Sequence, residues 1–216
     1  MEKIIYFYAL ISVAVFGCKN KNIRMAKACK TGNLNEVAMM ISSGVDINSK
    51  DEYGQTPLII ASFEGQYDIA KLLIKSGAEI NCQTVKGCTA LMLASWYNHP
   101  DIVELLIQRG ADTELGDSSA NTPLCMASFN GHINVVRILL KNNANVNAVN
   151  NDNWTPLIFA SQASKVEVVK ALLDRQANVN VITSRHFTAL DVSSDTAISS
   201  MLQEHGAKKV KGAMTH

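Results

Sequence analysis

The chain has 216 residues, of which 47% are hydrophobic and 18% are charged. Its 20 lysines and arginines are balanced by 19 aspartates and glutamates, which gives a formal net charge of +1. A chain this close to neutrality has no long-range positive field to attract nucleic acid, so we expect no nucleic-acid partner. The length is sufficient for a sizeable apolar core.

An apolar run extends from Ile4 to Phe16 near the start of the sequence. A run of this length suits the core of a signal peptide and is short for a membrane span of about 20 residues. The run ends in Val15-Phe16-Gly17-Cys18, which resembles the signal of bacterial lipoproteins, in which a small residue precedes a cysteine that becomes lipid-modified. The resemblance implies a signal peptide over residues 1–17, a lipid anchor on Cys18 and a short tether over residues 18–22.

Such a protein would be exported and held at the outer membrane or in the periplasm of a bacterial envelope. Lys19 follows Cys18, where an Asp commonly marks retention in the inner membrane, so the resemblance favours the outer membrane. The alternative is an ordinary signal peptide or an uncleaved signal anchor, with Cys18 an incidental thiol.

A unit of constant length repeats along the rest of the chain. Threonine can cap the first amide groups of a helix, and proline suits the first helical position because it has no N–H to leave unpaired. The second helix of each unit shows a period of 3.6 and stops at Gly77, Gly110, Asn143 or Gln176. The triplets that mark the repeat start 33 positions apart: Thr56-Pro57-Leu58, Thr89-Ala90-Leu91, Thr122-Pro123-Leu124, Thr155-Pro156-Leu157 and Thr188-Ala189-Leu190.

This pattern resembles the ankyrin repeat, a β-turn followed by two antiparallel helices. The resemblance implies an all-α solenoid of about six helix–turn–helix units with β-turn or hairpin fingers over residues 23–210. A single unit cannot bury its own apolar face, so both ends need polar caps. The first unit lacks the triplet and the last is shortened, which suits such caps. The expected units are 23–50 (N-terminal cap), 51–83, 84–116, 117–149, 150–182 and 183–210 (C-terminal cap), followed by a tail over 211–216.

Two features depart from the ankyrin pattern. The histidine that usually follows Thr-Pro-Leu is absent, so we expect apolar packing to replace its hydrogen bonds; the residues there are Ile59, Met92, Cys125, Ile158 and Asp191. The turn glycine is present at Gly54 and Gly87 and is then replaced by Ala120, Asn153 and His186.

Four cysteines remain besides Cys18. We expect Cys29 and Cys125 to pack in the core. Cys82 and Cys88 flank the turn at one repeat junction, and an exported protein would permit a disulfide between them. Two free thiols are the favoured interpretation, since connectivity cannot be deduced from sequence alone.

The sequence contains no catalytic constellation. It has no HExxH, CxxC or Gly-x-Ser-x-Gly motif and no phosphate-binding glycine loop. His99 and His132 occupy equivalent positions in successive units, but packed helices lie about 8–10 Å apart, which is too far for both to share a zinc ion routinely. The ankyrin resemblance implies a structural role for both. We therefore expect no enzyme activity, cofactor or metal.

The resemblance also implies a partner site in the concave groove between the turn tips and the exposed ends of the first helices. Nine aromatic residues follow Cys18, and all but Tyr67 and Phe159 fall at groove positions. Aromatic residues often anchor protein interfaces, although aromatics at these positions can instead pack between repeats. The predicted protein-binding residues are Tyr53, Gln55, Phe63, Glu64, Lys86, Trp96, Tyr97, Phe129, Asn130, Trp154 and Phe187. Of these, Phe63, Trp96, Tyr97 and Phe129 are expected to form one apolar strip.

These expectations favour a non-enzymatic, monomeric module that holds an unidentified protein in its groove and is anchored by lipid at a bacterial envelope. Two alternatives stay open. One is a secreted effector or toxin-like protein that acts on a host or competitor, and the other is an accessory or immunity factor for a periplasmic enzyme.

Overall fold

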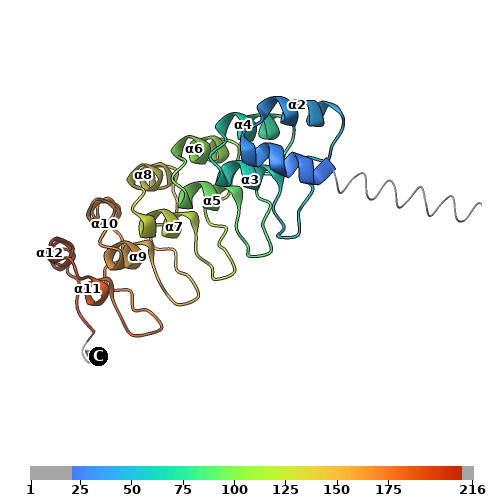
Figure 1. Cartoon of the computed structure of the whole chain (residues 1–216). Helices are drawn as coiled ribbons and strands as arrows, with labels where there is room; N and C mark the ends of the chain where they lie inside the picture. Colours follow the sequence, from blue (N-terminus) through green and yellow to red (C-terminus); the bar gives the residue numbers. More distant parts are fainter. Residues whose placement is uncertain (1–20, 211–216) are drawn as a thin grey trace, which may run out of the picture.

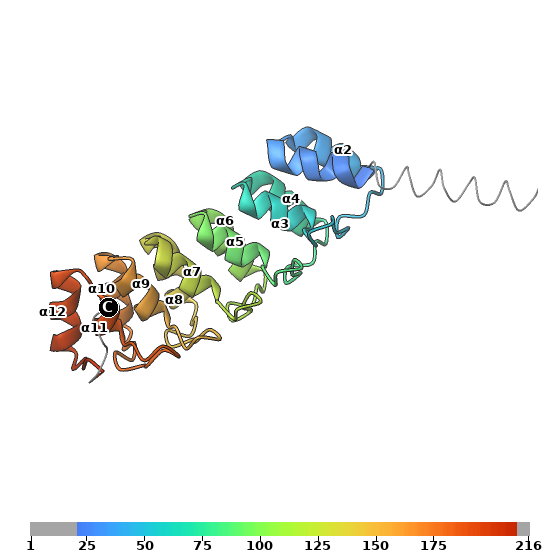
Figure 2. The ribbon, with the colours of Figure 1, turned by 60° about the horizontal axis from the view of Figure 1, so that its bottom comes forward.

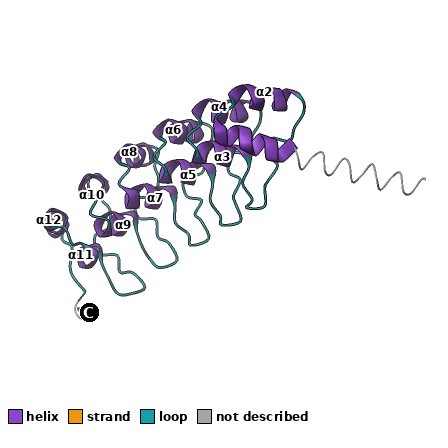
Figure 3. Ribbon diagram, viewed as in Figure 1, coloured by secondary structure: helices purple, strands orange, loops and turns teal. Residues whose placement is uncertain are grey.

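The computed structural model describes residues 21–210, which form an elongated stack of antiparallel helix pairs (Figure 1). The predicted signal peptide, Cys18, the start of the predicted tether and the tail over residues 211–216 lie outside the described residues. Residues 21–31 are helical, so residues 21 and 22, which the sequence assigned to the tether, belong to the first helix. No strand occurs between residues 21 and 210, and the expected all-α solenoid is confirmed (Figure 3).

Five short first helices form one row and the second helices form the other. The first helices are α3 (Pro57–Phe63), α5 (Ala90–Trp96), α7 (Pro123–Asn130), α9 (Pro156–Gln162) and α11 (Ala189–Val192). The second helices are α2 (Leu34–Ser42), α4 (Tyr67–Lys75), α6 (Pro100–Gln108), α8 (Ile133–Lys141), α10 (Val166–Leu173) and α12 (Thr196–Glu204). Each helix packs against its partner and against the next helix of its own row. The loops between units project as fingers from one side of the stack (Figure 2).

The threonine of each triplet caps its helix as expected. The hydroxyl oxygens of Thr56, Thr89, Thr122 and Thr155 accept from the backbone N–H three residues later, at 3.1–3.4 Å. The donors of these N–H groups are the residues that replace the ankyrin histidine. All four are at most 2% exposed: Ile59, Met92, Cys125 and Ile158. Apolar packing at these sites is therefore confirmed. Asp191 differs, because its carboxylate accepts from the Thr188 N–H at 2.9 Å and completes a capping box.

Hydrogen bonds join successive units at two places. A column of side-chain oxygens, one from each unit, accepts from backbone N–H groups of the following unit at 2.8–3.0 Å; the acceptors are Asn48, Asn81, Glu114, Asn147 and Asn180. Each finger after the first also donates a backbone N–H to the preceding finger, as Val85 does to the Tyr53 carbonyl at 3.0 Å. These bonds fix the spacing of the fingers and hence the shape of the concave side.

One apolar core runs through the stack from Met25 in the first helix to Leu202 in α12. It includes Cys29, which is fully buried as expected. The units therefore depend on one another for burial, as a repeat array requires.

Candidate protein-binding groove

The fingers on the concave side are locally rigid. In the finger over residues 51–55, the Asp51 carboxylate accepts from the N–H groups of Tyr53 and Gln55 at 2.9 and 2.8 Å. The Gly54 N–H closes the turn on the Asp51 carbonyl at 3.0 Å. Asp117 and Asn150 hold the later fingers in the same way. The Tyr53 side chain is thus presented, 59% exposed, from a fixed turn.

Two successive fingers and the helices α3 and α5 enclose a hollow of about 350 Å³. Four of the predicted binding residues come together in its wall, namely Tyr53, Gln55, Phe63 and Lys86. The remaining wall consists of Thr84, Val85, Cys88 and Leu93. Leu93 was not among the predicted residues, although it lies one helical turn before Trp96 on the same helix face.

The hollow is chemically an apolar pocket with a cation at its rim. Val85 is 72% exposed at one edge, and Phe63 and Leu93 are half-buried at the floor. Burial raises the pKa of the Cys88 thiol, so this side chain is a neutral part of the wall near pH 7. Lys86 is exposed beside it. Such a hollow can take up a large apolar side chain, with Lys86 placed to meet a carboxylate next to it.

A second hollow, of about 390 Å³, lies between the first helix and the finger over residues 49–55. Its wall includes Asn22, Ile23 and Ala26 from the helix and Ile60 from α3. Gln55 lines both hollows, so they adjoin along the concave side.

Further along the groove, aromatic rings contact one another. The Trp96 and Phe129 rings stack with centroids 6.4 Å apart, and Phe129 meets Phe159 edge to face at 6.1 Å. Phe159 in turn lies 5.1 Å from Trp154. Phe159, which the sequence interpretation left outside the groove, thus contacts two of the predicted groove residues. Its repeat spacing from Leu93, which lines the hollow, was the signal for these contacts.

The expected single strip of Phe63, Trp96, Tyr97 and Phe129 is divided. The Phe63 ring contacts Tyr97 edge to face at 4.4 Å, while Trp96 stacks with Phe129 in the next unit. Trp96 is half-buried and packs against a small cluster of Met92, Cys125 and Met126, whereas Tyr97 remains 45% exposed.

The remaining predicted residues lie at the ends of helices or in the last finger. Glu64 is the C-terminal cap residue of α3 and is half-buried. The Asn130 side-chain amide donates to the Met126 carbonyl within its own helix at 3.1 Å. Phe187 is half-buried in the finger over residues 183–187. Its backbone N–H donates to the Thr183 hydroxyl oxygen at 3.0 Å and so closes this finger. None of the three lines the two hollows.

His99 and His132 have the structural role that the resemblance implied. The Nε2 atom of His99 lies 3.2 Å from the Phe63 carbonyl oxygen, and that of His132 lies 2.8 Å from the Trp96 carbonyl oxygen. Each ring therefore holds the end of the preceding first helix, where the groove aromatics sit. Among residues 21–210 no group of three or more His, Cys, Asp or Glu is placed to hold a metal ion.

The four described cysteines are free thiols, as favoured from the sequence. Cys29 and Cys125 are buried, and burial raises the pKa of Cys29 to about 12. Across the same described range, no helix combines the length and the apolar character that a membrane crossing requires.

The fold and its groove agree with comparisons to known proteins. The family model for ankyrin repeats, in three copies, matches residues 7–84, 25–117 and 91–183. The chain therefore belongs to the ankyrin repeat family, whose arrays are scaffolds for protein–protein interaction with extended concave binding surfaces. It is similar to the ankyrin repeat-containing protein YIL001W of Saccharomyces cerevisiae, with 40% identity over 45 residues, which is 21% of this chain. The match spans only 9% of the length of the yeast protein.

Proposed function

We propose that this protein is a non-enzymatic binding module that holds another protein in the concave groove between its fingers and first helices. The observation that carries the proposal is the hollow of about 350 Å³ between two successive fingers, walled by Tyr53, Phe63 and Lys86. Interfaces are anchored by a few large side chains in such pockets, and Tyr is enriched among them. Fixed fingers reduce the entropy that is lost on binding.

The opposite side of the array supports the choice of the groove. The exposed positions of the second helices carry charges of both signs, as in Lys71, Asp101, Glu104 and Arg137. Mixed charges of this kind are typical of a solvated helix surface. Exposed aromatic side chains are instead found on the groove side, in Tyr53, Tyr97 and Phe129.

Site-specific photo-crosslinking tests this proposal in cells that produce the full chain. A photoreactive phenylalanine replaces Tyr53 or Tyr97 in the groove, and Tyr67 at the start of α4 serves as the control position. We expect the same protein to be crosslinked from residues 53 and 97 and not from residue 67. Crosslinks that arise from residue 67 alone, or from none of the three positions, would contradict binding in the groove.

We also propose that the protein is exported and anchored by lipid on Cys18 at a bacterial envelope. The support is the sequence Val15-Phe16-Gly17-Cys18 at the end of the apolar run that begins at Ile4. A lipid at this position would hold the array within a few residues of the membrane surface, since the first helix covers residues 21–31. Labelling with a fatty-acid analogue should mark the wild-type chain and not Cys18→Ala. Equal labelling of the two chains would exclude Cys18 as the anchor.

A further inference from the structure

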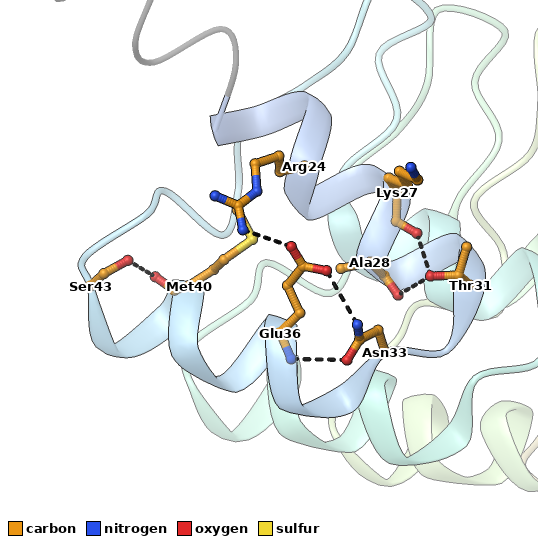
Figure 4. A network of polar contacts seen from close by, with 8 residues as sticks. All are labelled: Arg24, Lys27, Ala28, Thr31, Asn33, Glu36, Met40 and Ser43. Carbon is orange, nitrogen blue, oxygen red and sulfur yellow. Dashed lines mark hydrogen bonds and ion pairs between the residues drawn. The ribbon is translucent and has the colours of Figure 1, made fainter.

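The N-terminal cap carries a charge opposite to that of the remaining array. Residues 23–50 contain four lysines or arginines and two acidic residues, whereas residues 51–210 contain twelve basic and sixteen acidic residues. The Arg24 guanidinium lies 2.8 Å from the Glu36 carboxylate on α2 (Figure 4). This is the one ion pair within residues 21–210, so the cap lysines have no carboxylate partner there.

Two of these lysines occupy groove positions. Residues 23, 27 and 30 are spaced four and three apart on one side of the first helix, and all three are exposed, whereas Met25, Ala28 and Cys29 are buried on the other side. Counting by the repeat period, Lys27 stands in the column of Ile60 and Leu93. Lys30 stands in the column of Phe63 and Trp96. The groove floor is therefore cationic in the cap and apolar from α3 onwards.

Asp51 and Glu52 line the hollow beside the cap, but neither carboxylate pairs with a lysine of the cap. The Asp51 carboxylate is held by the N–H groups of its own finger and by the Gln55 side-chain amide at 3.1 Å. Glu64 lies further along the array, at the end of α3, so Lys27 and Lys30 stay available to acidic groups of a partner. Lys86, which also has no carboxylate partner within the described range, stands at the rim of the apolar hollow.

We propose that the groove takes an extended protein segment in which acidic residues lie against Lys27 and Lys30 and large apolar residues enter the hollow between α3 and α5. This inference deepens the proposed function and rests on it. The argument is charge complementarity at one end of a continuous surface, since Ile23 lines the hollow beside the cap and Gln55 joins that hollow to the next. Exposed ion pairs each contribute a few-fold at most, so the apolar part supplies affinity and the acidic part sets direction.

A peptide-display selection tests the proposal without knowledge of the natural partner. The full chain, held in detergent, is presented at low salt to a library of random linear peptides that are long enough to span the cap and both hollows. We expect the selected peptides to be enriched in large apolar residues and at least about twofold in Asp and Glu, with the acidic residues at one end. Raising the salt to about 0.5 M should remove the acidic preference, because exposed charges are then screened.

Matched charge-reversal variants locate the effect. In the double variant Lys27→Glu and Lys30→Glu, the acidic preference should be lost or replaced by a preference for Lys and Arg. The control Lys71→Glu and Lys75→Glu makes the same charge change on exposed positions of α4 and should leave the preference intact. Binders without an acidic preference, or a preference that survives the cap variant, would overturn this inference alone. A library that yields no binders at all would overturn the proposed function with it.

Discussion

The two halves of the groove use the same positions of the repeat in different ways. In the first half, formed by residues 51–116, Tyr53 and Phe63 line a hollow of about 350 Å³. In the second half, formed by residues 117–182, the rings of Phe129, Phe159 and Trp154 contact one another. Register within the repeat therefore does not decide whether an aromatic side chain is available to a partner. The residues of the adjacent units determine this availability. Leu93 and Cys88 leave space in the first half, and Phe159 and Trp154 fill the equivalent positions in the second half.

The backbone differs between the same two halves. Each full repeat has three residues in the left-handed region: in the finger, between the helices and after the second helix. In residues 51–83 these are Gly54, Gly65 and Gly77, with φ of 76°, 71° and 93°. In residues 150–182 they are Asn153, Ser164 and Gln176, with φ of 58°, 54° and 59°. A side chain in this conformation costs about 1–2 kcal/mol relative to glycine, so the second half depends more on its ring contacts.

The largest expected effect comes from removing a ring that packs. Phe159→Ala should lower the free energy of unfolding by about 3 kcal/mol, because Phe159 contacts both Phe129 and Trp154. Phe63→Ala, in the open half, should cost about 1 kcal/mol, because its ring faces a hollow and its ring partner Tyr97 is itself 45% exposed. Urea denaturation of the full chain measures both. Equal losses for the two variants would remove the distinction between the halves.

A second effect should be seen in local opening. Residues 150–205 should exchange their amide hydrogens faster than residues 51–116, by a factor that corresponds to about 1–2 kcal/mol. The reason is the absence of glycine from the left-handed positions of one repeat, followed by a last unit whose first helix, α11, is a single turn. Hydrogen exchange with mass spectrometry reports both ranges in one sample. Uniform protection along the array would contradict this prediction.

A smaller and more specific effect should follow from exchanging one left-handed residue between the halves. Gln176→Gly should raise the free energy of unfolding by about 0.5–1 kcal/mol, and Gly77→Gln should lower it by a similar amount. A Cβ atom at Gly77 would meet nothing within 4 Å, so this pair reports backbone strain without a packing change. Thermal unfolding of the two variants suffices. If Gln176→Gly lowered the free energy of unfolding instead, the contacts of the glutamine side chain would stabilise the fold by more than its left-handed backbone costs.

Most of the fold could be predicted from the sequence, because the repeat spacing and the helix-start chemistry of Thr56 and its equivalents are local signals. The left-handed positions could also be read from Gly54 and Gly77, since few other residues favour that conformation. The hydrogen-bond column that includes Asn48 and Asn81 was missed, although its spacing is visible, because its partners lie in the next unit along the chain.

The candidate site could be predicted only in part. Tyr53, Gln55, Phe63 and Lys86 do meet, because two neighbouring fingers and helices bring them together. The ring contacts of Phe159 were not foreseen, because residues of the neighbouring units make them and periodicity within a single helix does not reveal them. Leu93 was missed for the same reason.

The central claim is that the open half of the groove holds the partner and the packed half supports the fold. The most direct test is the yield of the crosslink from residue 53 in two backgrounds, Phe63→Ala and Phe159→Ala, at a temperature at which both chains are folded. Loss of an anchor worth about 2 kcal/mol lowers affinity about thirtyfold, so Phe63→Ala should abolish most of the crosslink at limiting partner concentration. Phe159→Ala should retain the wild-type yield despite its lower stability. A full yield in Phe63→Ala together with a lost yield in Phe159→Ala would contradict the account.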